Sequence, residues 1–408
     1  MNILFVTTNN YPYDGTCSNI IKNILFRGKM LNTENSFSVL AGKNSIEDND
    51  CEECNSVTVH RAFSWTAIDR DSFKKTIKKH PAPAIKGLIC RGVFHIQNKY
   101  VPSFFIDYTT SSAFYDALKR IDAKRFDLII TIAGRYDACY AVMKYCSIYN
   151  VRFLLYQVDP CATNKVYSKE SLGRRTALET SLYEKASYVI TTPLIMQEHT
   201  EDSFNKFIYK MKSLEFPVLI PDVVHHSMNN NKKKVMFLGS FYKNVRSPEY
   251  MFYLFDDLLA NNQISMDLVG VSAEILNERQ KNFPIKCHGR KSIAECKKMM
   301  QEADVLINIG NRIDNQVPSK IFEYISSGKQ IVNICAVNNC PTLQYLEKYP
   351  LALNIVEDKS AIDEQKKRLN EFIFSSFENL TEEWITKQYM ECTPEYVAKE
   401  IIDVISKI

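Results

Sequence analysis

The residues with the clearest capacity for chemistry lie in one segment, 315–330, which reads Asn-Gln-Val-Pro-Ser-Lys-Ile-Phe-Glu-Tyr-Ile-Ser-Ser-Gly-Lys-Gln. An apolar, strand-like run precedes it, and Pro318 in a first-turn position predicts that a helix begins there. The backbone N–H groups of Ser319 and Lys320 then point out of the helix start, which carries about half a positive charge and suits a phosphate. Glu323 lies one turn further in, where its carboxylate can accept hydrogen bonds from a vicinal diol such as a ribose.

Two other strand ends carry residues suited to the same kind of ligand. The predicted strand within 235–246 ends at Gly239, and a loop then leads to Arg246 before the next predicted helix. Ligands of open α/β sheets bind outside the carboxyl ends of the strands, where the planar guanidinium of Arg246 can clamp a diphosphate. A later strand ends at His288 and Gly289. The backbone there can hydrogen-bond the edge of a base, and the glycine permits a close approach.

The elements that position these residues are short apolar runs separated by segments with helical spacing of apolar residues. The runs lie at 2–7, 36–41, 56–60, 127–132, 151–158 and 188–192, and then at 234–239, 264–270, 284–288, 304–309, 330–335 and 352–356. Nearly continuous apolar strands that alternate with helices indicate parallel sheets covered on both faces. We therefore predict an α/β fold with two Rossmann-like, doubly wound domains.

The predicted domain boundary lies in a polar segment rich in turn formers, residues 220–234. It separates an N-terminal domain, 1–220, from a C-terminal domain, 233–377. Residues 378–408 form one or two further amphipathic helices.

Composition excludes several classes of protein. The chain of 408 residues has a net charge of only +4, which is too balanced for a dedicated nucleic-acid binder, so no nucleic-acid partner is expected. No apolar stretch is long enough to span a membrane, and the N-terminus lacks the basic start of a signal peptide. We therefore expect a cytoplasmic protein.

The order of these motifs resembles the C-terminal half of glycosyltransferases with the GT-B fold. The matching pieces are Gly-Ser-Phe with Arg-Ser-Pro-Glu, then His-Gly-Arg, then Ala-Asp-Val-Leu-Ile-Asn, then Pro-Ser-Lys-Ile-Phe-Glu-Tyr. The chain is similar to the retaining family 4 group, which includes enzymes of capsule, O-antigen and exopolysaccharide synthesis. The resemblance implies that the C-terminal domain binds a nucleoside-diphosphate sugar and the N-terminal domain a glycan or lipid-linked acceptor across a cleft. It also implies that 378–408 cross back to the N-terminal domain.

The resemblance also implies roles for individual residues. Glu323 matches the second glutamate of the family's E-x7-E motif, and Asn315 stands where the first would be. Arg246 falls near the diphosphate-binding lysine, and Ser240 replaces that lysine's partner arginine. We hypothesise that Lys320 supplies the missing phosphate cation.

In a retaining transfer the leaving phosphate can itself take the acceptor proton, so the protein must mainly stabilise charge on the diphosphate. Gly15 resembles the turn that faces the donor phosphates, and Asp159 at a strand end is placed to contact the acceptor or the sugar, although aspartate there is also a common turn former. The expected catalytic residues are Arg246, Lys320 and Asp159. The expected donor site comprises Gly15, Gly239, Ser240, Arg246, His288, Gly289, Asn315, Pro318, Ser319, Lys320 and Glu323.

No metal or cofactor is expected beyond the nucleotide sugar itself, which is a substrate. The Asp-x-Asp spacings at 48–50 and 69–71 do not follow a predicted strand, as a metal-dependent transferase would require. Cys51 and Cys54 have CxxC spacing, but no second pair completes a zinc site, and we interpret them as part of a solvated acidic loop.

Residues 70–105 do not fit the alternation of strands and helices. They are basic and aromatic, and two interpretations stay open: contact with an anionic membrane at the inner face of the cell membrane, or an ordinary solvated helix. Two alternatives to a transferase also remain. One is a nucleotide-sugar 2-epimerase, and the other is a non-catalytic GT-B subunit or glycan-binding protein, motivated by Asn315 and Ser240.

Overall fold

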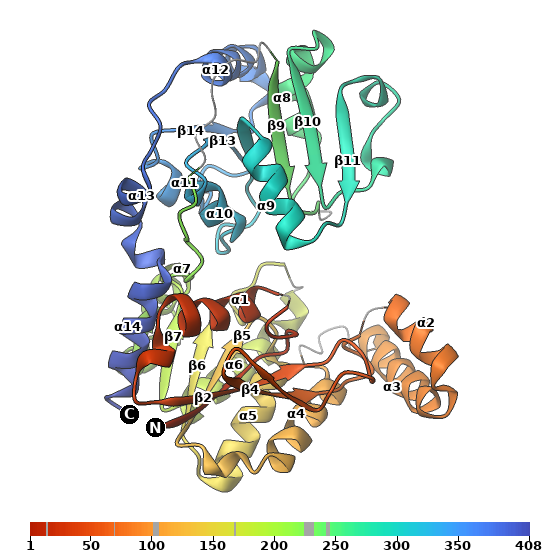
Figure 1. Ribbon diagram of the computed structural model, residues 1–408, viewed down its shortest axis with the longest axis vertical. Coiled ribbons are helices and arrows are strands. Elements are labelled where there is room, and N and C mark those ends of the chain that lie inside the picture. Colours follow the sequence, from red (N-terminus) through yellow and green to blue (C-terminus); the bar gives the residue numbers. More distant parts are fainter. Residues whose placement is uncertain (14, 69, 101–105, 167–168, 224–231, 242–244) are drawn as a thin grey trace. The chain divides into compact units, whose positions relative to one another are not determined.

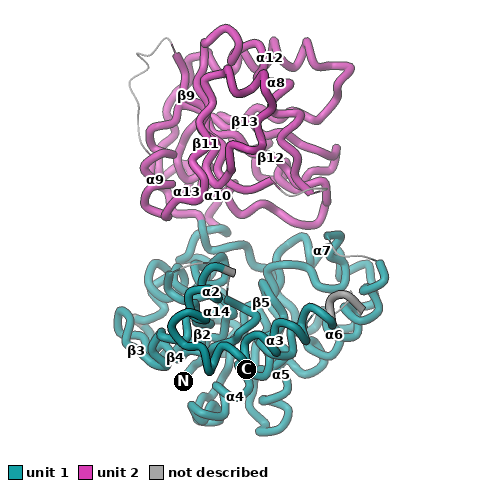
Figure 2. The backbone as a smooth tube through the Cα atoms, turned by 90° about the vertical axis from the view of Figure 1, so that its right-hand side faces the viewer, with its two compact units in different colours: residues 1–218, 391–408 teal, residues 219–390 magenta. Residues whose placement is uncertain are grey.

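Two sheets organise the chain, each in its own compact unit. The computed structural model describes residues 1–13, 15–68, 70–100, 106–166, 169–223, 232–241 and 245–408 (Figure 1). Unit 1 comprises Met1–Val218 with Glu391–Ile408, and unit 2 comprises Leu219–Met390 (Figure 2). The predicted α/β fold with two mainly parallel sheets is confirmed.

The sheet of unit 1 has the strand order β3-β4-β2-β1-β5-β6-β7-β8. Its strands are β1 (Asn2–Val6), β2 (Ser36–Gly42), β3 (Cys51–Cys54), β4 (Val57–Ala62), β5 (Leu128–Ala133), β6 (Phe153–Gln157), β7 (Tyr188–Thr191) and β8 (Met211–Ser213). All six predicted strands form, because their apolar runs are buried on both faces of the sheet.

The interpretation of Cys51 and Cys54 as part of a loop was wrong. They begin and end β3, an antiparallel edge strand on β4. Glu52 in this strand pairs with the buried Arg61 of β4. The acidic, alternating pattern of β3 reflects a strand with one solvated face, which composition alone does not separate from a loop.

Helices cover both faces of this sheet (Figure 1). They are α1 (Thr16–Lys22), α4 (Tyr108–Arg120), α5 (Tyr136–Tyr149), α6 (Leu172–Lys185) and α7 (Pro193–Glu201). After α1 the chain continues as a π-helix (Asn23–Arg27) and a 3-10 turn (Met30–Asn32). Helices α2 (Arg70–Lys79) and α3 (Pro81–Tyr100) form a hairpin beside the sheet.

Unit 2 holds a six-stranded parallel sheet of order β11-β10-β9-β12-β13-β14. The strands are β9 (Lys233–Leu238), β10 (Ile264–Val269), β11 (Ile285–Gly289), β12 (Val305–Ile309), β13 (Gln330–Cys335) and β14 (Ala352–Val356). The helices are α8 (Glu249–Ala260), α9 (Ile293–Glu302), α10 (Lys320–Ser326), α11 (Leu343–Leu346), α12 (Ile362–Phe374) and α13 (Glu382–Gln388). Every strand predicted for this half forms within about one residue of its expected bounds.

The C-terminal segment passes from unit 2 to unit 1 at a later residue than we expected. Helix α14 (Pro394–Ile405) packs in unit 1, where a Cβ on Gly28 would lie 2.4 Å from the Cβ of Ala398. Helix α13 belongs to unit 2 because it packs beside α10, and the hydroxyl of Tyr389 donates to the carbonyl of Tyr345 at 2.8 Å. The part that returns to unit 1 is therefore 391–408 and not the whole of 378–408. Within the described residues, no helix combines the length and apolarity needed to span a membrane.

Candidate functional site

Three glycines stand at neighbouring strand ends in unit 2: Gly239 after β9, Gly270 after β10 and Gly289 at the end of β11. Gly270 has a φ of 88°, and a Cβ there would lie 2.5 Å from the carbonyl oxygen of Gly239. Around the ideal Cβ position of Gly289 there is open space. We call these three strand ends the glycine ledge: neighbouring atoms fill the space beside Gly239 and Gly270, and only Gly289 leaves open space for an approaching group. Gly270 was not among the site residues predicted from the sequence, and its place beside Gly239 follows from the parallel pairing of β9 and β10.

Arg246 lies against this ledge. Its Nη2 donates to Oδ1 of Asn311 at 2.8 Å, and its Nη1 lies 3.5 Å from the point where a Cβ on Gly239 would stand. Asn311 follows β12 and donates to the carbonyl of Gln316 at 3.3 Å. The guanidinium is thus held between the ends of two adjacent central strands, β9 and β12.

Helix α10 is docked onto the same sheet edge by Tyr324. The buried hydroxyl of Tyr324 accepts a hydrogen bond from the backbone N–H of Leu238, the last residue of β9, at 2.9 Å. Burial raises the pKa of Tyr324, the charge of Glu323 raises it further, and Arg246 lowers it. Glu323 and Arg246 therefore both lie within electrostatic range of one hydroxyl group. The helix begins at Lys320 with Ser319 as its N-cap, two residues after Pro318, where the sequence predicted its start.

Lys320 and Glu323 form an ion pair on the exposed side of α10. Nζ of Lys320 lies 2.7 and 2.9 Å from the two carboxylate oxygens of Glu323, and the side chains are 43% and 40% exposed. We expected Lys320 to face a phosphate, whereas here its ammonium spans the carboxylate that we assigned to a ribose. A carboxylate has about four acceptor positions, so Glu323 keeps capacity for a diol beside its lysine.

Asn315 and Ser240, the two positions that depart from the family motif, differ in how deeply they are buried. Asn315 is only 4% exposed, and Ser240 is half-buried directly after Gly239. A buried amide carries no charge and needs no counter-ion, which a glutamate at the same position would. The structure thus gives a local reason why asparagine is tolerated at 315.

The side chain of His288 takes part in a network of charges on the face of the sheet. Its Nε2 lies 2.7 Å from Oδ1 of Asp267, whose second oxygen lies 3.1 Å from Nζ of Lys234. This network lines a groove of about 740 Å³ between α9 and strands β9 to β11. The backbone of Gly289, which we predicted to meet a base, already donates to Val271 at 3.1 Å and accepts from Gly270 at 2.7 Å.

In unit 1 the carboxyl ends of β1, β5 and β6 bring Gly15 and Asp159 into one region. Gly15 has a φ of 93° at the start of α1, and any Cβ there would lie 2.3 Å from the side chain of Asn9. Burial raises the pKa of the Cys17 thiol, and the charge of Asp159 raises it further, so Asp159 lies near the first turn of α1. The hydroxyl of Tyr136 donates to the backbone carbonyl of Asp159 at 2.7 Å.

The segment that carries Asp159 is held by charged residues that the sequence analysis did not identify. Arg175 on α6 is 2% exposed, and its Nη1 donates to the carbonyls of Cys161, Ala162 and Asn164 at 2.8, 2.7 and 2.9 Å. One turn along, Glu179 accepts from the N–H of Ala162 at 2.7 Å. The spacing of Arg175 and Glu179, one helical turn apart, was the only signal in the sequence, and it is common on solvated helices.

Glu179 also contacts a fully buried histidine. His199 lies with Nε2 3.3 Å from Glu179 and Nδ1 2.9 Å from Asp202. Burial lowers the pKa of His199, but the hydrogen bonds and charges of the two carboxylates outweigh burial and raise it overall. Among the residues that the structure describes, no cluster of three or more His, Cys, Asp or Glu side chains could hold a metal ion.

Comparison with known proteins identifies the architecture. No protein-family model and no curated protein sequence matches the chain. Among solved structures, it is similar to sucrose-phosphate synthase from Thermosynechococcus elongatus, with a TM-score of 0.64 and 13% identity over 100% of this chain and 98% of that one. It is also similar to Anabaena HepE in complex with UDP and glucose (TM-score 0.59, 13% identity, 100% of both chains) and to the lipopolysaccharide outer core galactosyltransferase WaaB (TM-score 0.56, 13% identity, 100% of both chains). These neighbours are GT-B glycosyltransferases, and the chain has the GT-B fold.

Proposed function

We propose that the protein is a glycosyltransferase that uses a nucleoside-diphosphate sugar. The observation that carries the proposal is the arrangement at the strand ends of unit 2. There the guanidinium of Arg246 is anchored beside Gly239 at the end of β9, and α10, the helix that carries Glu323, is docked on the same strand end through Tyr324. A diphosphate needs a fixed cation, which Arg246 supplies on this proposal. A ribose needs a hydrogen-bond acceptor, which Glu323 supplies from the first turn of α10. HepE has been solved with UDP and with UDP-glucose, which makes UDP-glucose the first donor to test.

The acceptor on this proposal is a glycan or a lipid-linked sugar in the synthesis of a cell-surface polysaccharide, at the inner face of the cell membrane. Transfer proceeds with retention, as the motif resemblance implies. Arg246 stabilises the developing charge on the leaving diphosphate, and Asp159 in unit 1 contacts the acceptor or the transferred sugar. In this scheme the diphosphate takes the acceptor proton, so the protein supplies mainly preorganised positive charge.

The direct test is to titrate the purified chain with UDP-, GDP- and ADP-sugars by calorimetry and to measure release of the nucleoside diphosphate. We expect one class of donor to bind and to turn over, with no change on adding a chelator. Absence of binding by every donor would refute the proposal. Loss of turnover with chelator would refute the metal-independent part of it.

Glu323→Gln keeps the shape of the side chain and removes its charge. We expect donor affinity to fall about ten- to a hundredfold, because a charge-assisted hydrogen bond contributes about 1.5–3 kcal/mol. Glu371→Gln is the matched control, because Glu371 also lies on an exposed helical face of unit 2 beside a lysine, Lys367. Lys320→Ala separates two roles: if Lys320 binds phosphate the affinity falls, and if it only screens Glu323 the affinity is unchanged or rises.

One observation favours a second candidate, a non-catalytic GT-B subunit. Among the described residues, Glu323 forms its only ion pair with its own helical neighbour, Lys320, and the position of the first motif glutamate is a buried amide. Donor binding without turnover on any acceptor would support this candidate over the transferase.

A further inference from the structure

Helix α3 exposes an apolar stripe that the fold does not cover. Five aliphatic residues share one helical face at spacings of three, one, four and three, which we call the α3 stripe: Ile85, Leu88, Ile89, Val93 and Ile96. Their side chains are 48–62% exposed. Gly92 lies on the same face, and a Cβ there would meet no atom within 4 Å. The stripe is about 17 Å long at 1.5 Å per residue.

The stripe is not the face by which α3 packs. The opposite face carries Ala84 and Gly87, and a Cβ on Gly87 would lie 2.5 Å from Trp65 and 2.8 Å from Phe73. Arg91 fixes the same side, because its Nε donates to the carbonyl of Trp65 at 2.9 Å and its guanidinium stacks 4.0 Å from the ring of Phe73. The helix is thus anchored on one side and presents aliphatic side chains on the other.

The structure bears on the two interpretations that the sequence left open for residues 70–105. A membrane contact anchored by aromatic residues does not apply to Phe73, which is buried and forms an edge contact with Trp65. The exposed apolar residues are aliphatic and lie on α3. Residues 101–105, including Phe104 and Phe105, lie outside the described residues, as do the side chains of 97–100.

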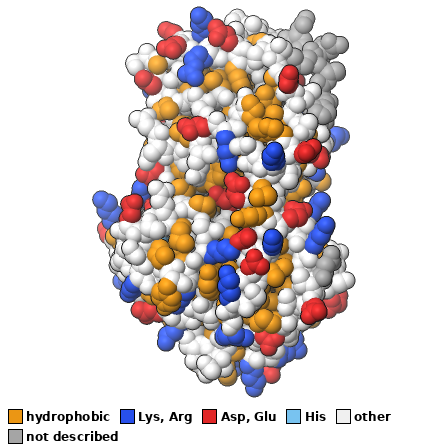
Figure 3. All heavy atoms as spheres, turned by 90° about the vertical axis from the view of Figure 1, so that its left-hand side faces the viewer, with side chains coloured by type: hydrophobic (Ala, Val, Ile, Leu, Met, Phe, Trp, Pro, Cys, Tyr) orange, Lys and Arg blue, Asp and Glu red, His pale blue; other side chains and the backbone are white. Residues whose placement is uncertain are grey.

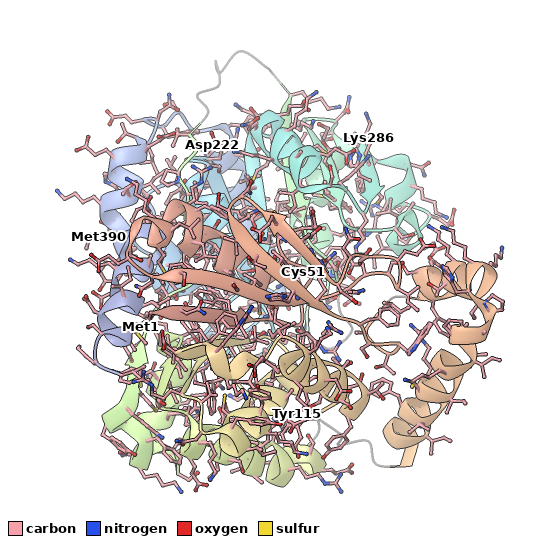
Figure 4. All side chains as sticks on the ribbon, turned by 60° about the horizontal axis from the view of Figure 1, so that its bottom comes forward. Met1, Cys51, Tyr115, Asp222, Lys286 and Met390 are labelled. Atoms are coloured by element: carbon pink, nitrogen blue, oxygen red, sulfur yellow. The ribbon has the colours of Figure 1, made fainter. Side chains whose placement is uncertain are left out.

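The charge around the stripe is strongly positive. Residues 70–96 contain seven basic residues and one acidic residue, whereas the whole chain has a net charge of +4, so the rest of the chain is slightly acidic. Lys74, Lys75, Lys78 and Lys86 are exposed on the two helices. In contrast, acidic and basic side chains are interspersed on the face shown in Figure 3. Figures 1 and 4 both show α2 and α3 standing to one side of the sheet of unit 1.

We propose that the α2–α3 hairpin docks unit 1 onto an anionic lipid surface, with the α3 stripe in the acyl region and the lysines at the headgroups. Aliphatic side chains flanked by lysines on an amphipathic helix are the features that interfacial binding requires. A second copy of the chain is the less favoured occupant, because pairing two such faces would bring two strongly positive surfaces together. The proposal goes beyond the transfer reaction and does not depend on the identity of the donor.

The test is flotation of the full chain with phosphatidylcholine vesicles that contain or lack phosphatidylglycerol, at low and high salt. We expect binding to the anionic vesicles only, weakened by salt. Leu88→Ser with Ile89→Ser should reduce binding about tenfold or more, because two exposed aliphatic chains no longer enter the bilayer. Lys74→Gln with Lys78→Gln should reduce it roughly thirtyfold, at about 1 kcal/mol per lysine.

The control is Ile148→Ser on α5, which removes a comparably exposed isoleucine of the same unit at 65% exposure and should leave binding unchanged. Failure of the wild-type chain to float at low salt, or equal binding by the stripe variant, would overturn the proposal. A dimer that the stripe variant abolishes, without any vesicle binding, would assign the stripe to a subunit interface instead. Donor calorimetry on the same samples separates this outcome from failure of the proposed transfer, because unit 2 carries the donor residues.

Discussion

Replacing Arg175 by methionine tests whether a buried charge holds the segment that carries Asp159. Methionine keeps most of the apolar volume of the side chain but removes every donor. The carbonyls of Cys161, Ala162 and Asn164 would then lose the Nη1 group that reaches them at 2.7–2.9 Å. Each buried acceptor left without a donor costs about 1–3 kcal/mol, so we expect unit 1 to lose about 3–5 kcal/mol after partial relaxation.

The two tryptophans make this measurement specific to one unit. Trp65 belongs to unit 1 and Trp384 to unit 2, and the chain has no others. In a Trp384→Phe background, Trp65 fluorescence through a urea titration reports the unfolding free energy of unit 1. Arg174→Met is the matched control, because Arg174 is the exposed neighbour on α6 and should change that free energy by less than about 0.5 kcal/mol.

A loss below about 1 kcal/mol for Arg175→Met would refute the reasoning, because the three carbonyls would then have other donors available. A functional readout follows from the same variant. If Arg175 positions Asp159 for transfer, turnover should fall at a temperature where the protein is still folded, while donor affinity, which we assign to unit 2, stays unchanged.

Two further predictions concern unit 2. Gly270→Ala should destabilise the unit by about 2 kcal/mol or more, because a φ of 88° and a Cβ 2.5 Å from the carbonyl of Gly239 are both unfavourable; Gly289→Ala, with positive φ but open space, should cost clearly less, and equal losses in urea melts would contradict the steric reasoning. Burial lowers the pKa of Lys329 to about 8 in the folded chain, below the unfolded value of about 10.4. Above the unfolded pKa the lysine is neutral in both states, and its contribution to the stability of the folded chain is then at its maximum. That contribution is lost as the pH falls through 8, because the buried side chain must then carry a charge. The unfolding free energy of the wild type, relative to Lys329→Met, should therefore rise by on the order of 2 kcal/mol between pH 8 and 10; a flat difference would show that Lys329 titrates normally.

Several features of this protein were decided by the sequence alone. The apolar runs predicted every strand that is buried on both faces. A continuous run of apolar residues is enough to identify such a strand, whichever strands it pairs with. The positions of Arg246 and Glu323, the residues to which we assign donor binding, could also be predicted, because each lies at a fixed distance after a strand or helix start, and parallel strands bring their carboxyl ends to one edge.

Other features depended on contacts between residues far apart in the chain. The edge strand β3 has a solvated face and therefore lacked the apolar signal of the other strands. The ion pair between Lys320 and Glu323 was compatible with helical spacing, but so was a lysine that faces a phosphate, and only the packed helix distinguishes them.

Buried charge was the least predictable feature. The sequence gives no sign that Arg175, Glu179 and His199 are buried. Hydropathy depends only on the type of side chain, and not on the hydrogen-bond partners that stabilise a charged side chain when it is buried. Their partners lie up to 22 residues away, at Gln157 for Glu179. The exposed face of α3 is the converse case: the sequence left open a membrane contact or an ordinary solvated helix, and only the tertiary structure shows which face of α3 packs on the core and which stays exposed.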